Sequence, residues 1–544
     1  MSEPARLEAL SGSRFVATLA VVLQHFAYTF GYPAALVANP HVSEQALTYF
    51  FIHSGFILTY RYPSLEGNRA DDYLFARVCR VWPMHLLALA LYVALVPLSQ
   101  RAPEWEGAGV LAANAALVQD WVPNVFLNCS FNGVAWSLSA EVFLYLAFVL
   151  MIAQWSRRWR WWLAGSAALT AALVLACSRW PAGLPPGADP WSVLFYHPLT
   201  RVCEFALGMA LAVLRPAAEA RAPEVGSARG TALEVGLVAL AAAAALGGQV
   251  AGPALVRAGL VSAVTALWLR MSGFVIVPYA AVVLALSLER GVVSRALKWG
   301  AMAALGESTL CVYLVHFPLM RMCRPYAAAA GAWPGAVFAP LFLAGCVLAG
   351  HACWAAFDRP VRRALRAWWA RRRGSQAGSA AVALSRRLAV AAVFALTAGA
   401  AVVSWSRPAV PPLDSLARMR GRARGRVDVV GTPVVLAPHP LAPDAIPTGV
   451  VEVTGWAADP RDARAVLAAY VTLDGGPPVR ATAGWARPDV ARLLGGDAFA
   501  ACGLAARVWV GDLAPGAHAL ALHAVFADGY ETVDEVSLSV PEAR

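Results

Sequence analysis

Long apolar runs that carry almost no charge constrain the fold of this sequence more than any other feature. The chain of 544 residues is 59% hydrophobic and only 14% charged, whereas a soluble protein needs roughly 25% charged residues to cover its surface. A large core does not explain the deficit, because single cores stop growing at about 250–300 residues. The sequence therefore predicts a polytopic α-helical membrane protein. Runs of about 20 apolar residues, long enough to span a bilayer, lie near 8–30, 43–61, 81–99, 131–153, 160–178, 191–214, 301–322, 334–356 and 386–405.

The stretch 232–288 is apolar almost throughout, and charge decides how many spans it contains. Weak breaks near Gly252 and Arg270 would allow three short spans. Cytoplasmic loops, however, are enriched in Lys and Arg. With a cytoplasmic N-terminus, the arginines after residue 358 fall on the cytoplasmic side only if 232–288 crosses twice. We therefore expect about 10 core spans up to residue 356, with part of 250–270 re-entrant or lying at the outer surface.

A basic block follows these core spans. Nine arginines lie between Arg359 and Arg387, and two tryptophans stand among them in RPVRRALRAWWARRR. Directly after an apolar span, this composition indicates a cytoplasmic membrane-surface segment and argues against nucleic-acid binding. The N-terminus, MSEPARLEALSGSR, has acidic residues and no cleavage-site pattern, so we do not expect a removable signal peptide. Residues 386–405 are expected to form an eleventh span that carries the rest of the chain out of the cytoplasm.

From about residue 428 the composition changes to a soluble, strand-rich pattern. VVEVTGWAAD, AYVTLDGG, ARVWVGDL and HALALHAVFADG alternate apolar and polar residues and end in turn residues. They predict about seven or eight short strands in a β-sandwich. We therefore expect a membrane domain (1–370), a segment with the eleventh span and a linker (371–427) and an extracytoplasmic all-β sandwich domain (428–544).

The first apolar run, RFVATLAVVLQHF, contains two ionisable residues, Arg14 and His25. At about 100° and 1.5 Å per residue, they lie within about 20° of one helical face and about 16 Å apart along the axis. A charge at the bilayer centre costs about 2.5–3.5 kcal/mol on insertion scales, so such residues indicate function or a buried partner. The alternative is an interfacial arginine that reaches toward water, together with a packed histidine.

A partner carboxylate, Glu141, lies in NGVAWSLSAEVFLYLAF. Ser137 and Tyr145 share its helical face at i−4 and i+4, and Asn132 and Trp136 are expected at the outer mouth. A carboxylate that reaches a histidine in a water-poor cavity can set its tautomer and raise its basicity. General-base catalysis on a hydroxyl requires that arrangement. The alternative is a single buried Glu in a structural hydrogen bond.

Two arginines on the cytoplasmic side, Arg77 and Arg80, are three residues apart and share one helical face. Paired guanidiniums suit a phosphate or pyrophosphate, because the planar fork donates two hydrogen bonds to one group; positive-inside anchoring is the alternative. No CxxC pair or Cys/His cluster indicates a metal site. Further polar residues in apolar spans are candidates for the cavity or, alternatively, for structural roles: Tyr313, His316, His53, Arg201, Glu204 and Asp358.

In this order, these stretches resemble the integral-membrane acyltransferase family 3, whose members mostly O-acylate bacterial surface glycans. The resemblance covers about residues 8–360. It rests on Arg-x10-His (Arg14, His25), FF-x-x-SGF (Phe50 to Phe56), RxxR (Arg77, Arg80), WSL-x-x-E-x-x-x-Y (Trp136 to Tyr145), R-x-x-E-F-x-x-G (Arg201 to Gly208), YL-x-H (Tyr313 to His316) and a terminal acidic-Arg-Pro.

The resemblance implies that Arg14 and His25 are essential and that Glu141 belongs to the functional cluster. It also implies that Arg77 and Arg80 serve an acyl-CoA donor, which acts as a co-substrate in place of a permanently bound cofactor. Three positions depart from the family's usual residues. His53 stands where an aliphatic residue is usual, Leu310 replaces a frequent aromatic, and Asp358 replaces Glu.

Some members of the family carry a periplasmic esterase-like domain after an eleventh span. Here a β-sandwich without a GxSxG or GDS-type nucleophile takes that place. The resemblance therefore implies that the membrane part completes the transfer itself or with a separate periplasmic partner protein.

We therefore expect a multi-pass protein of the bacterial inner membrane that moves an acyl group, acetyl in the simplest case, from cytoplasmic acyl-CoA to a hydroxyl of an envelope glycan or lipid-linked sugar. His25 would act as general base, Glu141 would orient it, and Arg14 would hold the donor or stabilise developing charge. A proton-coupled transporter of acyl groups or glycans is an alternative, because intramembrane His, Glu and Arg also suit a permeation path. Another is an envelope-anchoring protein whose active part is the β-sandwich.

Overall fold

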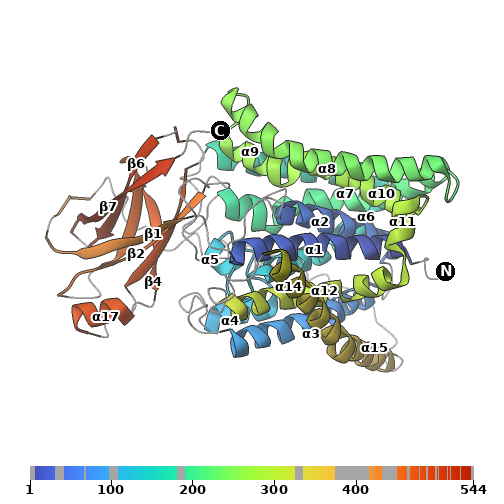
Figure 1. Ribbon diagram of the computed structural model, residues 1–544, viewed down its shortest axis with the longest axis horizontal. Coiled ribbons are helices and arrows are strands. Elements are labelled where there is room, and N and C mark those ends of the chain that lie inside the picture. The colour runs from blue at the N-terminus through green and yellow to red at the C-terminus, as the bar shows by residue number, and fades with distance from the viewer. Residues whose placement is uncertain are drawn as a thin grey trace.

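The computed structural model of the chain is mostly helical, with strands at its C-terminal end (Figure 1). It describes residues 6–30, 42–65, 69–96, 108–179, 190–324, 335–373 and, with short gaps, 416–431 and 450–540. The expected eleventh span, 386–405, lies outside the described residues. The helices are α1 (Glu8–Phe30), α2 (Val42–Arg61), α3 (Arg69–Leu95), α4 (Ala108–Ala116), α5 (Val125–Asn128), α6 (Trp136–Arg179), α7 (Pro198–Glu219), α8 (Ala228–Arg257), α9 (Ala263–Trp268), α10 (Phe274–Leu288), α11 (Val292–Leu297), α12 (Gly300–Cys323), α14 (Gly335–Cys353) and α15 (Arg359–Arg373).

Six helical segments of the described residues are long and apolar enough to cross a membrane. Helices suit such runs because backbone groups in lipid must be satisfied within the segment. α1, α2 and α7 have similar lengths but are not among the six, so the expected count of about ten core spans stays a prediction. The six are Ala70–Leu95, Gly133–Arg179, Ala228–Arg257, Ala263–Leu288, Gly300–Cys323 and Val337–Arg372.

α6 is continuous over 44 residues, yet its contacts show that the chain reverses direction within it. Trp136, at its start, packs on Tyr196 with ring centroids 4.9 Å apart. Thr170 donates a hydrogen bond of 3.5 Å to the carbonyl of Thr200. In a straight helix Trp136 and Thr170 would be about 50 Å apart, whereas their partners are only four residues apart in sequence. This geometry agrees with two passes, on either side of QWSRRWR.

The stretch 232–288 forms two long helical segments, as the charge argument predicts. α8 packs against α10, which continues α9 through a π-helical turn, Leu269–Gly273. Gly259 ends α8 with a positive φ of 67°, a conformation that glycine adopts without strain. The Ser262 hydroxyl then caps α9 by accepting from the Thr265 N–H at 3.1 Å. The re-entrant alternative for part of 250–270 is therefore wrong, because these residues are two helix ends and a turn. The other alternative, that part of them lies at the outer surface, stays a prediction.

α2 and α7 cross at unusually close range, through Gly55 and Gly208. A Cβ on Gly55 would collide with the carbonyl oxygen of Phe205, and one on Gly208 with that of Ile52. Small residues at a crossing let helix backbones approach in a membrane, where association depends on packing. This contact fixes α2, which carries FF-x-x-SGF, against α7.

The C-terminal strands form one antiparallel sheet around a main apolar core, with two smaller buried clusters. The two outermost strands of the sheet also approach each other. The contact between them is a hydrogen bond of 2.7 Å from the Val427 N–H to the Asp534 carboxylate. The expected strand-rich domain is thus confirmed, but one curved sheet replaces the two separate sheets of a sandwich. In spatial order the strands are β1 (Arg424–Gly431), β2 (Val450–Ala458), β5 (Gly503–Trp509), β4 (Val479–Trp485), β3 (Ala468–Leu473), β6 (Gly516–Val525) and β7 (Tyr530–Val540).

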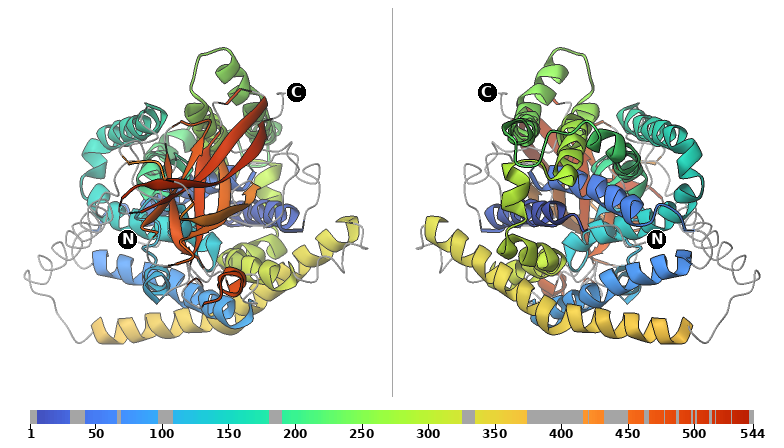
Figure 2. Two further views of the ribbon diagram at one scale, coloured as in Figure 1. Left: turned by 90° about the vertical axis from the view of Figure 1, so that its left-hand side faces the viewer. Right: turned by 90° about the vertical axis from the view of Figure 1, so that its right-hand side faces the viewer.

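The two ends of the helical bundle differ. Figure 1 shows the N-terminus and α15 at one end and the β-strands beyond the opposite end, and the side views of Figure 2 show the sheet covering that end of the bundle. The short α17 (Pro488–Leu494) lies on the sheet domain. The arginine-rich helix and the sheet are therefore separated by the length of the bundle.

Candidate active site

A cavity inside the helical bundle collects most of the predicted site residues. Apolar side chains from α2, including Leu47, Phe50 and Phe51, form part of its wall. The polar side chains come from α1, α2, α3, α6 and α12, so residues far apart in sequence meet in one place. They are Arg14, Thr18, His53, Ser54, Arg77, Arg80, Ser137, Glu141, Tyr145, Thr309 and Tyr313.

Glu141 sits in this cavity and is held by a residue that sequence reasoning did not assign. The Ser54 hydroxyl donates a hydrogen bond of 3.0 Å to its carboxylate. Arg14, partly buried in the same wall, interacts electrostatically with both Glu141 and Arg80. Ser54 belongs to the FF-x-x-SGF segment, and that motif was the signal that could have found it.

Tyr313 and Ser137 close the cavity opposite the arginines. Their hydroxyls lie 2.9 Å apart, and the Tyr313 hydroxyl also donates to the carbonyl of Val134 at 3.1 Å. The Asn132 side chain donates to the carbonyl of Leu314 at 2.9 Å. The start of α6 and the middle of α12 are thereby joined, so the segments WSL-x-x-E and YL-x-H form one structural unit.

His25 lies beyond the cavity and pairs with His316. Nδ1 of His25 and Nε2 of His316 are 2.9 Å apart, and the two rings are stacked with centroids 5.2 Å apart. Both side chains are buried. Among the described residues, Glu141 accepts a hydrogen bond from Ser54, and His25 pairs with another histidine. The expectation that Glu141 orients His25 is therefore not met by these contacts.

The pairing of two neutral imidazoles has a chemical consequence. In the bond between them, one ring must donate and the other must accept. If Nδ1 of His25 is the donor, its Nε2 keeps a free lone pair; if it is the acceptor, Nε2 carries the proton. The ring of Tyr313 lies against the ring of His316, with the two centroids 5.7 Å apart. His316 thus connects the cavity to His25.

Arg77 is held by aromatic rings at the other end of the cavity. Its guanidinium carbon lies 5.6 to 5.7 Å from the ring centroids of Tyr62, Tyr73 and Tyr145. Cation–π contacts of this kind attract the guanidinium without consuming its hydrogen-bond donors. Its Nε–H is buried and has no hydrogen-bond partner among the described residues. Arg77 therefore retains a donor for a ligand.

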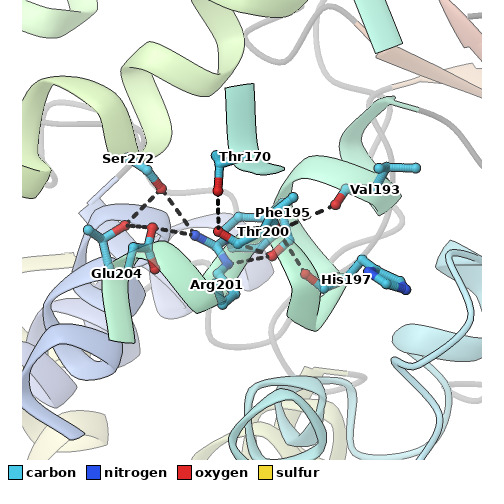
Figure 3. Close-up of polar contacts among 9 residues, drawn as sticks. Thr170, Val193, Phe195, His197, Thr200, Arg201, Glu204 and Ser272 are labelled. Atoms are coloured by element: carbon cyan, nitrogen blue, oxygen red, sulfur yellow. Dashed lines mark hydrogen bonds and ion pairs between the residues drawn. The ribbon is translucent and has the colours of Figure 1, made fainter. Parts of the chain in front are cut away.

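Arg201 and Glu204 form a buried ion pair beside the cavity and not in it (Figure 3). Nη1 of Arg201 lies 2.9 Å from Glu204 and donates to the Ser272 hydroxyl at 3.0 Å. Its Nε and Nη2 donate to the carbonyl of Phe195. The guanidinium nitrogens are therefore engaged in contacts within the protein, which agrees with the alternative of a structural role for this pair. It also packs over Phe51, a cavity wall residue, with 5.5 Å to the ring centroid.

The remaining candidates are placed as follows. His53 lines the cavity, and its Nε2 is buried without a partner among the described residues. Trp136 packs on Phe195 outside the cavity lining. Asp358 pairs with Arg362 at 2.7 Å. Within the described part of the chain, no group of three His, Cys, Asp or Glu side chains is arranged to hold a metal ion.

Comparison with known proteins identifies the family of the helical domain. The family described as "Acyltransferase domain" matches residues 7–356. Acyltransferase MdmB from Streptomyces mycarofaciens is 28% identical over 335 residues, which cover 58% of this chain and 79% of that protein. Protein 2 in picA locus, from Rhizobium radiobacter, is 38% identical over 96 residues, 17% of this chain and 47% of that protein. No solved structure matches.

Proposed function

This chain belongs to that acyltransferase family, and on this premise we propose that it moves an acetyl group from cytoplasmic acetyl-CoA to a hydroxyl of an envelope or extracellular glycan. The observation that carries the proposal is the single cavity that joins Arg14, the RxxR pair (Arg77 and Arg80) and Glu141. Three guanidiniums in one buried cavity suit a polyanionic donor. Membership of an enzyme family argues against the transporter and anchoring alternatives.

The donor would enter from the end of the bundle that holds the RxxR pair. These guanidiniums would bind the pyrophosphate, leaving the pantetheine arm to extend past Glu141 toward Tyr313. Thr18 lines the cavity, and His25 follows seven residues later on α1, about 10 Å further along the helix. The acceptor hydroxyl would therefore meet the thioester near the histidine pair.

His25 would act as the general base. Its Nε2 takes the proton of the acceptor hydroxyl while the oxygen attacks the thioester carbonyl carbon. The tetrahedral intermediate collapses as the carbon–sulfur bond breaks, and the imidazolium returns the proton to the departing thiolate, giving an O-acetyl ester and free CoA. The Arg14 guanidinium would stabilise the negative charge of the donor. Glu141 and Ser54 would keep that guanidinium in place.

The proposed orientation of the protein in the membrane is based on the difference between the two ends of the bundle. The arginine-rich α15 and the N-terminus would face the cytoplasm of a bacterial inner-membrane protein, and the sheet domain would lie outside and bind glycan or a periplasmic partner. Deletion of residues 428–544 would then reduce acceptor acylation but preserve CoA release. An equal loss of both activities would contradict this role.

The direct test uses purified protein in nanodiscs. Release of CoA from acetyl-CoA, measured as free thiol, should be saturable in wild type. In Arg77→Gln/Arg80→Gln the KM for acetyl-CoA should rise by at least about two orders of magnitude, the effect of losing about two charged hydrogen bonds. Arg61→Gln, which removes a charge from the end of α2, serves as the matched control. Wild-type protein that is folded and releases no CoA with any acceptor extract would refute the proposal.

A further inference from the structure

A second group of arginines lies next to the RxxR pair, on α15. This helix docks on the first turns of α3: the indole N–H of Trp369 donates to Asp72 at 2.9 Å, and Trp369 stacks on Phe75 with ring centroids 4.3 Å apart. The arginine-rich helix is therefore fixed against the helix that carries Arg77 and Arg80. A segment that only anchored the protein to lipid would not need this docking.

The docking brings like charges together. Arg362 forms an ion pair with Asp358 at 2.7 Å, and both side chains are mostly buried. Arg80 interacts electrostatically with each member of this pair. Arg366, one turn further along α15, is exposed and repels Arg362. Within this cluster of described residues, Arg80 and Arg362 thus share the carboxylate of Asp358, and Arg366 adds a third positive charge.

The position of the cluster relates it to the donor. Arg80 lines the cavity and also faces the α15 arginines, so the cluster begins where the cavity lining ends. In coenzyme A, the ribose 3′-phosphate lies beyond the pyrophosphate as seen from the thioester. If the RxxR pair holds the pyrophosphate, a further dianion would be carried outward, toward α15.

We propose that Arg362 and Arg366 bind the ribose 3′-phosphate of the donor. Asp358 holds Arg362 in place, and the exposed Arg366 completes a two-pronged contact with the phosphate oxygens. The proposal rests on the proposed function for the identity of the donor. It assigns the α15 arginines to selection of coenzyme A over analogues that lack this phosphate.

The test measures equilibrium binding of CoA and of dephospho-CoA, which lacks only the 3′-phosphate, to the full-length protein in phosphatidylcholine nanodiscs. Wild type should bind CoA about tenfold more tightly, the effect of one charged hydrogen bond. Arg366→Gln and Arg362→Gln should bind both ligands with the Kd that wild type has for dephospho-CoA. Arg371→Gln removes the same charge from an exposed position of α15, about 140° around the helix from Arg366 and about 180° from Arg362, and should retain the preference.

Several results would overturn the proposal. One is a wild type without the tenfold preference; another is variants that weaken both ligands equally. If the variants differ from wild type only after phosphatidylglycerol replaces phosphatidylcholine in the nanodiscs, the arginines bind a lipid phosphate instead. Arg366→Gln alone decides the matter if loss of Arg362 prevents folding. Preferential CoA binding without acyl transfer would leave this site standing while the proposed function fails, and no CoA binding at all would refute both.

Discussion

At the scale of single residues, the site depends on pairs that no local pattern reveals. The spacing of Arg14 and His25 places both on one face of α1, and Arg14 lines the cavity, whereas His25 lies beyond it. Their partners, however, are 291 residues away in one case, His316, and on a different helix in another, Glu141. Helical periodicity fixes a face, but not which residue of another helix meets it.

His316→Phe tests the histidine pair. The substitution keeps a ring but removes the nitrogen that faces His25, so the tautomer of the base is no longer fixed. We expect the rate of acyl transfer to fall by about two orders of magnitude, at the lower end of general-base contributions, with CoA binding unchanged. His351→Phe, which replaces a half-buried histidine on α14, is the control. A fall in CoA affinity equal to the fall in rate would indicate a packing role instead.

The sheet domain contains a histidine that makes its stability depend on pH. Burial, with the nearby charge of Arg418, lowers the pKa of His523 to about 4. Between this value and the unfolded pKa of about 6.5, the unfolded chain binds a proton that the folded one does not. Stability is therefore full above pH 6.5 and falls as the pH drops toward 4, by up to about 3 kcal/mol.

Hydrogen exchange of β3 and β6 peptides in the full-length protein measures this effect. Protection should decrease from pH 7 to pH 5 in wild type. His523→Gln has no titrating group there and can keep hydrogen bonds to Thr472 and Thr532, so its protection should change much less. Equal pH dependence in both proteins would show that His523 is not responsible.

At the scale of elements, composition predicted helices and strands better than their connections. Apolar runs located α1, α2, α3 and the two halves of α6, because lipid leaves the helix as the only solution for them. The division of 232–288 into two long helical segments followed from charge alone. A re-entrant segment was wrongly expected there, because Gly252 reads as a break although its backbone stays helical and packs against Arg270.

The glycine crossing of α2 and α7 can be tested by one methyl group. Gly208→Ala places a Cβ against the carbonyl of Ile52 and should lower Tm in detergent by several degrees, since about 1–3 kcal/mol is typical of overpacking. Gly236→Ala, on α8 with nothing within 4 Å of the added atom, should leave Tm unchanged or slightly higher. Equal Tm values for both variants would mean that the crossing tolerates separation.

At the scale of the whole molecule, the fold places three groups of polar residues along one axis. The arginines of α3 and α15 lie at one end, the cavity with Glu141 lies inside, and the histidine pair lies further along α1 toward the end that the sheet domain covers. A donor that binds at one end and an acceptor that arrives at the other would then never need to share an entrance. This arrangement is the central claim, because it requires the same chain to bind CoA and to acylate a glycan across the membrane.

Mass spectrometry of envelope glycans tests that claim most directly. Cells that produce wild type, His25→Ala or Arg77→Gln/Arg80→Gln at equal levels of folded protein would be compared for O-acetyl esters. We predict that wild type adds acetyl groups to glycan hydroxyls, that His25→Ala adds none, and that the double variant adds far fewer. Glycans acetylated to the wild-type level in cells with folded His25→Ala would contradict the account.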